Sequence, residues 1–369
     1  MRVTTRVGNS SILLKNYEDV SLPDMDVGHM AEFISVIEGS HFDAAPLPMQ
    51  SIASIVGVRA SSWPLLCNES ARDDHISKIS RRFLEALTDA SSHEYFLTWL
   101  RIRKFLDSFE PATVSVEAWQ KFASENCHGD DFLSGNKLQI PKYATDGSST
   151  GRLTVTSGPN YLTLAKTFRS TLKPSSPGQS VVNIDFVSLE PRVAMWHARL
   201  PHPDGDVYEN VMGQCGLSDR STAKLATLSA LYGASISKLS EQLGNRKRAQ
   251  DLVTKVRSIF RVEKLESTLE SQAACGIVRN AFGRPLREAT LTERVRVNHF
   301  LQSTAAEMAV VMFSEICEAF SNARPIAVIH DALVLEIPTL EMEKFVSACE
   351  SESWQGFPFP VKCDVISQA

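Results

Sequence analysis

The spacing of apolar residues divides the chain into long helical stretches and a few strand-like runs. Apolar positions recur at helical spacing over residues 74–87 and 95–106, which predicts two amphipathic helices. Residues 207–271 predict a longer helical region with one interruption at Tyr232–Gly233. Residues 291–319 predict another long helix.

Short β-branched runs predict strands in the second half of the chain. Val181–Ile184 reads as a short buried strand, residues 325–338 as a hairpin and residues 357–366 as a last strand. We also expect two strands about a turn within residues 275–287, and a loop over residues 128–151.

The first 70 residues carry little readable pattern. Prolines punctuate short apolar pieces there, so we expect irregular structure with one helix near Met30–Ile37.

The composition is that of an ordinary soluble globular chain. Of 369 residues, 43% are hydrophobic and 22% are charged, and the net charge of -5 argues against a uniformly basic nucleic-acid coat. A basic groove is still compatible with that charge, because binding depends on where the charges lie. The seven cysteines form no CxxC pair, which favours reduced thiols over a zinc site or a disulfide framework. No apolar run is long enough to span a membrane, and together with the reduced thiols this leads us to expect a cytoplasmic protein.

The first candidate for chemistry is an acid at a strand end. Asp185 directly follows the apolar run 181–184, at the carboxyl end where open sheets present groups to ligands. Pro191 fits the first turn of a helix that begins just afterwards. Taken alone, an Asp here more often caps the next helix than binds a metal.

A second acid lies in the tight connection of the predicted hairpin. His330, Asp331 and Ala332 occupy that connection, where an Asp usually serves the turn itself. Two strands that each deliver one Asp to a sheet edge would instead pair their carboxylates. Mg²⁺ prefers one or two carboxylates together with phosphates and water, so two acids and a polyphosphate suffice.

A stripe of four residues marks the helix that begins near residue 220. Arg220, Lys224, Leu228 and Tyr232 lie four apart, which keeps them on one face with a drift of about 40° per step. Arg and Lys one turn apart can bind successive phosphates, and Gly233 ends the helix. The alternative is an amphipathic helix whose charges simply face water.

Six segments together resemble family A DNA polymerases of the polymerase I type. In chain order they are TGRLTVTSGPN (150–160), VVNIDFVSLEPR (181–192), RSTAKLATLSALYG (220–233), NAFGRPLR (280–287), VNHFLQSTAAE (297–307) and VIHDALVLE (328–336). The resemblance implies an α+β right-hand polymerase fold with an antiparallel-sheet palm, helical fingers and a short helical thumb. The implied parts are an N-terminal region of unknown role (1–70), a reduced thumb (71–145), the first part of the palm (146–200), the fingers (201–286) and the second part of the palm (287–369).

The resemblance also implies roles for individual residues. Asp185 and Asp331, with the main-chain carbonyl of Phe186, would hold two Mg²⁺ ions, for which Mn²⁺ could substitute. Arg220 and the catalytic Lys224 would bind the nucleotide phosphates. Glu190 would exclude the ribose 2′-OH with help from Tyr232. The remaining nucleotide-binding positions are Ser188, Leu189, Tyr208 and Leu228, and the DNA-binding positions are Arg152, Asn160, Arg294, Asn298, Gln302 and His330. The expected partners are primer-template DNA and dNTPs, and a processivity or replication partner is left open.

Several residues depart from the pattern of that family. Ala332 stands where Glu is common, Leu228 replaces an aromatic residue, Tyr208 replaces His and Ser188 replaces a longer polar side chain. Because these positions surround the nucleotide, we expect altered fidelity or efficiency rather than loss of activity. The N-terminal portion is too short for the proofreading domain of the family, so we expect no 3′–5′ exonuclease activity, and a reduced thumb predicts low processivity.

Two other functions remain open from the sequence. A single-subunit RNA polymerase relative would share the fold and both aspartates, but Glu190 and Tyr232 argue against it. A degenerate polymerase could persist as a DNA-binding scaffold, but retention of both acids and both cations argues against decay.

Overall fold

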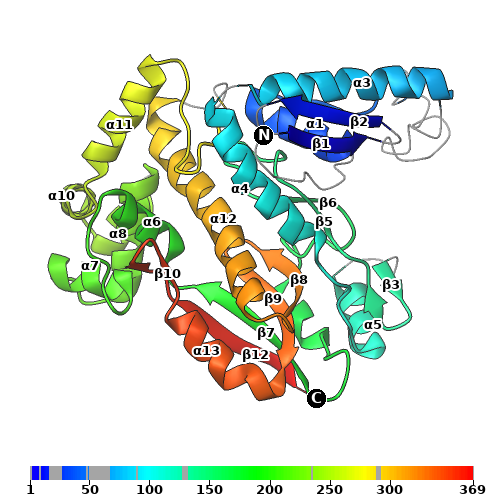
Figure 1. The fold of residues 1–369 in the computed structure, drawn as a ribbon. Helices are drawn as coiled ribbons and strands as arrows, with labels where there is room; N and C mark the ends of the chain where they lie inside the picture. The colour runs from blue at the N-terminus through cyan, green and yellow to red at the C-terminus, as the bar shows by residue number, and fades with distance from the viewer. Residues whose placement is uncertain are drawn as a thin grey trace. The chain divides into compact units, whose positions relative to one another are not determined.

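The computed structural model of the chain describes most of its residues (Figure 1). The described ranges are 2–7, 10–15, 27–46, 49, 67–88, 90–126, 132–233, 236–287 and 292–368, without the side chains of 2–15, 90, 91, 93, 293 and 294. They divide into two compact units, one of Met1–Trp99 with Phe282–Arg287 and one of Leu100–Ala281 with Glu288–Ala369. The subdomain boundaries expected from the sequence remain predictions.

The first unit combines a hairpin with helices around an aromatic core. Strands β1 (Arg2–Val7) and β2 (Ser10–Lys15) pair antiparallel, so the prediction of irregular structure is wrong there. Helix α1 (Val27–Glu38) confirms the helix expected near Met30. With α3 (Glu69–Ala86) and the start of α4 (Ala90–Asp107) it packs the rings of Phe33, Phe83, Tyr95, Phe96 and Trp99 together.

The second unit is built on a four-stranded antiparallel sheet of order β12–β7–β9–β8. The strands are β7 (Gln179–Phe186), β8 (Arg324–Ile329), β9 (Ala332–Pro338) and β12 (Val361–Gln368). The expected strand, hairpin and last strand are thus confirmed, as is a mixed α+β class. Every residue of β7 after Gln179 is buried except Asp185, which indicates a strand covered on both faces.

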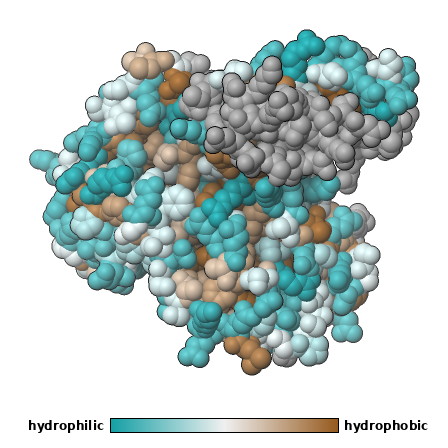
Figure 2. Space-filling model, viewed as in Figure 1, coloured by the Kyte–Doolittle hydropathy of each residue, from teal (hydrophilic) through white to brown (hydrophobic). Residues whose placement is uncertain are grey.

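Two layers cover β7. On one side lies an apolar cluster that includes Trp119, Tyr161 and Phe168 together with Val181 of the strand. On the other, the Phe186 ring packs in a tilted arrangement against Phe313 of the long helix α12 (Glu293–Ala319), with ring centroids 5.1 Å apart. Helix α13 (Met342–Glu350) packs on β12 and exposes charged residues. In Figure 2, hydrophilic and hydrophobic residues are interspersed over the part of the surface that is drawn in colour.

Among the described residues between β7 and α12, the structure has six helices. They are α6 (Leu189–His197), α7 (Val207–Cys215), α8 (Arg220–Tyr232), α9 (Ser237–Leu243), α10 (Arg246–Ile259) and α11 (Val262–Ala274). The region after residue 207 is helical as expected, but it breaks more often than the one interruption predicted. Gly216, Gly233 and Gly244 each end a helix with φ between 61° and 66°.

Smaller elements complete the second unit and correct two predictions. They are α5 (Val116–Glu125), β3 (Leu133–Ser134), β4 (Lys137–Leu138), β5 (Lys142–Ala144), β6 (Thr154–Ser157), η3 (Lys166–Thr171), η5 (Thr339–Glu341), β10 (Ser353–Trp354) and β11 (Phe357–Pro358). Short strands therefore occur within 128–151, where a loop was expected. Residues 275–287, all described, contain turns and isolated bridging positions, so the two strands predicted there are wrong.

Truncation of Phe313 should test the packing beneath the candidate site. Phe313→Ala removes a fully buried ring that contacts Phe186, and we expect it to lower the free energy of unfolding by about 3–5 kcal/mol. Urea denaturation followed by circular dichroism measures this change. Leu340→Ala, at a residue 99% exposed, is the control and should leave the stability unchanged. A loss below about 1 kcal/mol for Phe313→Ala would contradict this packing.

Candidate active site

The pairing of β7 with β9 brings the two predicted acids to neighbouring strand ends. Asp185 lies opposite Ala332 in the ladder, and the Phe186 N–H donates to the Asp331 carbonyl oxygen at 3.2 Å. Asp331 and His330 form the two-residue connection between β8 and β9, in which His330 has a φ of 58°. Residues separated by almost 150 positions along the chain are therefore held together by main-chain hydrogen bonds.

The electrostatics of Asp185 reflect this convergence. Burial, and then the nearby Asp331 carboxylate, raise the pKa of Asp185 to about 6, although Arg169 and Lys166 oppose the shift. Two like charges that repel each other favour a proton or a cation between them. The described residues contain no cluster of three or more His, Cys, Asp or Glu side chains arranged as metal ligands. A metal here would therefore use the two carboxylates together with oxygens from other sources, which suits Mg²⁺.

A recess next to Asp331 gathers further predicted residues. Its lining residues come from the 150–162 segment, the start of α6, α12 and the β8–β9 turn; they are Arg152, Leu153, Leu162, Leu189, Glu190, Gln302, Ala305, Ala306, Val310, His330 and Asp331. Apolar residues form part of the lining. Arg152 contributes a positive charge to it, and Glu190 and Asp331 contribute negative charges. Six positions expected from the sequence therefore line one concave surface.

Glu190 links this recess to α8. Its carboxylate accepts a hydrogen bond from Arg152 Nη2 at 2.9 Å, and it also lies close enough to the Tyr232 hydroxyl to shift the pKa of that tyrosine. Burial, and then the negative charge of Glu190, raise the pKa of Tyr232 well above its ordinary value. The Tyr232 hydroxyl therefore stays neutral at ordinary pH, and its O–H group is available as a hydrogen-bond donor toward the Glu190 carboxylate.

The cations of α8 converge on the ring of Tyr208. The Arg220 guanidinium lies 5.0 Å from the ring centroid and the Lys224 ammonium 5.7 Å, both within range of a cation–π interaction. Arg220 and Lys224 are exposed, whereas Leu228 and Tyr232 further along α8 are half-buried. The prediction that all four share one stripe of a helix ended by Gly233 is confirmed.

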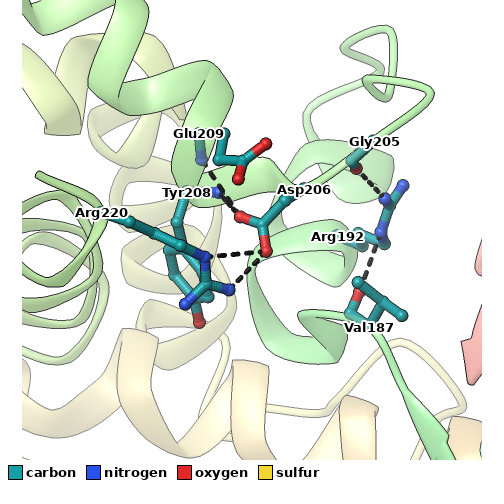
Figure 3. Close-up of polar contacts among 7 residues, drawn as sticks. All are labelled: Val187, Arg192, Gly205, Asp206, Tyr208, Glu209 and Arg220. Carbon is teal, nitrogen blue, oxygen red and sulfur yellow. Dashed lines mark hydrogen bonds and ion pairs between the residues drawn. The ribbon is translucent and has the colours of Figure 1, made fainter.

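Asp206 holds Arg220 in this position, as Figure 3 shows. Its carboxylate caps α7 by accepting from the Tyr208 and Glu209 N–H groups at 2.7 and 3.1 Å, and it also accepts from Arg220 Nε at 3.1 Å. Although burial opposes the shift, the hydrogen bonds from Arg220, Glu209 and Tyr208 lower the pKa of Asp206. Asp206 is therefore ionised at neutral pH and orients both a helix and a cation.

Ser188 occupies a strained turn between the acid and the recess. Its φ of 59° and ψ of 51° lie in the left-handed region, which a non-glycine residue rarely adopts, and its side chain caps no N–H group of α6. The Ser188 hydroxyl lies near Tyr208, whose pKa is raised to about 12 by burial and by Glu190. A strained main-chain conformation of this kind persists only where the surrounding structure holds it in place, and such conformations are common at functional sites.

Three predicted DNA-binding positions lie outside these contacts. Asn160 and Asn298 each have a buried Oδ1 atom with no hydrogen-bond partner. Arg294 lies in α12, but its side chain is outside the described residues. The roles of all three remain predictions.

The structure adds four residues that the sequence analysis did not single out. Arg192 and Asp206 organise the cations, and Lys166 and Arg169 of η3 lie near Asp185. Asp206 precedes a helix after a Pro/Gly-rich break, which is a readable capping signal. The two basic residues of η3 lie in no periodic pattern, so only their tertiary placement identifies them.

Comparison with known proteins agrees with this geometry. The family model described as DNA polymerase family A matches residues 136–367, well over half of the chain. The chain belongs to DNA polymerase family A. The resemblance drawn from the sequence motifs is therefore confirmed.

Two individual proteins illustrate the likeness. A thermostable DNA polymerase I of Thermus filiformis is 28% identical over 166 residues, which cover 40% of this chain and 19% of the relative. The solved POL domain of Pol1 from M. smegmatis, in complex with DNA primer-template and dNTP, superposes with a TM-score of 0.53 at 15% identity. That alignment covers 92% of this chain and 63% of the solved chain, and at this identity it shows the fold alone.

No helix within the described part of the chain is both long enough and apolar enough to cross a bilayer.

Because the pKa of Asp185 is raised, we expect removal of its charge by substitution to stabilise the folded protein at high pH and not at low pH. The folded state binds this proton more tightly than the unfolded chain, so ionisation destabilises the metal-free fold as pH rises from about 4 to about 6. Asp185→Asn should therefore stabilise the protein at pH 8 and have no such effect at pH 3.5, measured by urea denaturation with EDTA. Asp251→Asn, at an exposed acid of α10, is the matched control and should show no such pH-dependent gain. Equal stability of Asp185→Asn and the parent protein at pH 8 would contradict the raised pKa of Asp185.

Proposed function

We propose that this chain is a template-directed DNA polymerase that extends a primer 3′-OH with dNTPs by two-metal-ion nucleotidyl transfer. The observation that carries the proposal is the convergence of Asp185 and Asp331 at paired strand ends, beside a recess and a cationic helix. Phosphoryl transfer needs positioning and charge neutralisation rather than a protein nucleophile, and this set of side chains supplies both.

Asp185 and Asp331 would hold the metal ions, with the Phe186 carbonyl as a further ligand. Bound there, two Mg²⁺ ions would lower the pKa of the primer 3′-OH and neutralise the attacking and leaving oxygens. Mn²⁺ has the same preference for oxygen ligands and could substitute for Mg²⁺. The raised pKa of Asp185 supports this assignment, because a divalent cation would relieve the repulsion between the two acids.

Arg220 and Lys224 would bind the triphosphate and stabilise the leaving pyrophosphate. They project from the exposed face of α8, one turn apart, and Tyr208 brings both toward one position. A guanidinium can bind phosphate in a bidentate manner, and an ammonium adds a compact charge. Leu228, half-buried on the same stripe, would contact the sugar less closely than an aromatic ring.

Glu190 would select the sugar. Its carboxylate is fixed by Arg152 and Tyr232 at the wall of the recess, where it would clash with a ribose 2′-OH. Such a fixed wall favours dNTPs over rNTPs and separates the proposal from an RNA polymerase.

The remaining positions would contact DNA. Arg152 and Gln302 line the recess and would donate to minor-groove acceptors, which look alike for all correct base pairs. His330 would contact the primer end. Asn160, Asn298 and Arg294 would support this surface, and the unpartnered Oδ1 atoms of the two asparagines are compatible with a bound partner.

Neutralising either acid should abolish extension and leave DNA binding intact. Asp185→Asn and Asp331→Asn should each lower the primer-extension rate by roughly a thousandfold, because metal ions stabilise the transition state by several kcal/mol. The matched control is Asp251→Asn at an exposed acid of α10, which should keep its rate within about twofold of the parent. Fluorescence anisotropy with primer-template checks binding. Extension by the parent protein in Mg²⁺ tests the function itself, and its absence in both Mg²⁺ and Mn²⁺ would favour a non-catalytic scaffold.

Removal of the Glu190 side chain should relax sugar selection. Glu190→Ala is expected to raise the ratio of rNTP to dNTP incorporation by at least about tenfold, since it opens the wall of the recess. Single-nucleotide extension with each sugar measures the ratio. Glu209→Ala, at an exposed acid of α7, serves as the control. An unchanged ratio would show that Glu190 does not select the sugar.

A further inference from the structure

A buried arginine connects the strand end that carries Asp185 to the loop that carries Asp206. Arg192 of α6 is 1% exposed, and its guanidinium donates only to main-chain carbonyls among the hydrogen bonds that the structure gives. Nε donates to the Val187 oxygen at 2.9 Å and Nη2 to the Gly205 oxygen at 2.7 Å, both visible in Figure 3. Nη1 donates to the Pro358 oxygen at 3.1 Å and more weakly to the Pro203 oxygen at 3.4 Å.

These carbonyls belong to three separate segments of the second unit. Val187 lies two residues after Asp185, residues 203–205 lead into α7, and Pro358 ends β11. Burying a guanidinium is unfavourable unless its donors are satisfied. A guanidinium spreads five N–H donors over three nitrogens and here reaches four carbonyls, whereas an ammonium carries three donors on a single nitrogen and cannot reach all of these carbonyls at once.

The loop held by Arg192 in turn holds Arg220. Gly205, which accepts the shortest of the four hydrogen bonds, is adjacent to Asp206. Asp206 then caps α7 and binds the Arg220 guanidinium. A continuous path of polar contacts therefore runs from the end of β7, through Arg192 and the 203–206 loop, to the cation of α8.

We propose that Arg192 is a positioning residue that fixes Arg220 relative to the end of β7 through the 203–206 loop and Asp206. The inference rests on the proposed polymerase function, in which the triphosphate bound by Arg220 must meet the metals bound by Asp185. Small displacements of reacting groups lower rates strongly, so a fixed separation between the two sites has a direct kinetic value.

The test is Arg192→Lys, which keeps the buried charge and loses the fork. We expect the KM for dNTP to rise by roughly tenfold and kcat to fall, because hydrogen bonds to a charged group are lost and the loop is released. The dissociation constant for primer-template should stay within about twofold. If Arg192→Lys does not fold, Arg192→Gln, which buries no charge, is measured in its place.

Arg103→Lys is the matched control. Arg103 is also a buried arginine of the second unit, and it donates to the Tyr143 oxygen at 2.8 Å away from the described site. A purely structural role for Arg192 would give both variants the same kinetic constants at a similar fall in melting temperature. That result would overturn the proposal.

A double-mutant cycle tests the path itself. Asp206→Asn keeps a capping side chain but removes the charge that binds Arg220. If Arg192 acts through Asp206, the double variant should raise the KM for dNTP little more than the more severe single variant. Multiplicative effects on the KM would show that the two residues act independently and would overturn the path.

Amide hydrogen exchange without substrate tests the path whether or not the protein extends a primer. Arg192→Lys should speed exchange at Tyr208 and Glu209, whose N–H groups donate to Asp206. Exchange unchanged from the parent protein would overturn the proposal, whereas absence of extension by the parent would count only against the proposed function.

Discussion

The antiparallel pairing of β7 with β9 is the constraint on which the rest of the site depends. It places Asp185 opposite Ala332 and ties Phe186 to Asp331 through the main chain. The pleat makes this arrangement sensitive to register, since a slip of one residue would turn every side chain to the other face. Burial of β7 on both faces fixes the register, and the two-residue turn at His330 leaves no slack that could move Asp331 away.

This pairing also imposes an electrostatic cost that other parts of the fold must offset. Two acids at adjacent strand ends repel each other, and this repulsion adds to the larger effect of desolvation in raising the pKa of Asp185 to about 6. Lys166 and Arg169 reduce that repulsion from the η3 side, while the Phe186–Phe313 contact anchors the strand from the α12 side. Packing thus keeps two acids together against their mutual repulsion, an arrangement that local propensity alone would not favour and that is typical of functional sites.

The sequence predicted those parts of the fold whose signal is local. The strands around Val181 and Leu333 and the helix α12 follow from dense apolar runs, because these elements are buried in the folded protein. The same reasoning wrongly predicted strands within 275–287, where apolar residues pack from turns rather than from a ladder. It also missed the β1–β2 hairpin, which has little apolar alternation.

The acids and cations of the site could be predicted from the sequence because they lie in motifs that follow one another in a fixed order. The contacts that link these residues to one another in the folded chain could not be predicted. Arg192 stands in a helix of apolar neighbours, and nothing in its spacing indicates that it contacts the 203–205 loop. Likewise Asp206 reads as a helix cap, and only the folded chain shows that the same carboxylate binds Arg220. Contacts between segments depend on tertiary placement, which periodicity does not encode.

The contacts that hold Arg220 and Lys224 on α8 determine whether these cations are available to bind a phosphate. Tyr208 is a neutral ring, so it orients Arg220 and Lys224 without cancelling their charge. Asp206 does pair with Arg220, but that guanidinium is 47% exposed, and exposed ion pairs contribute only about 0–1 kcal/mol. Asp206 engages only Nε and Nη2 of Arg220, so the guanidinium keeps other N–H donors for a phosphate, while the described ion pairs give Lys224 no acid partner. An aromatic support and a weak ionic one together keep both cations in place and available, which a strong buried salt bridge would not allow.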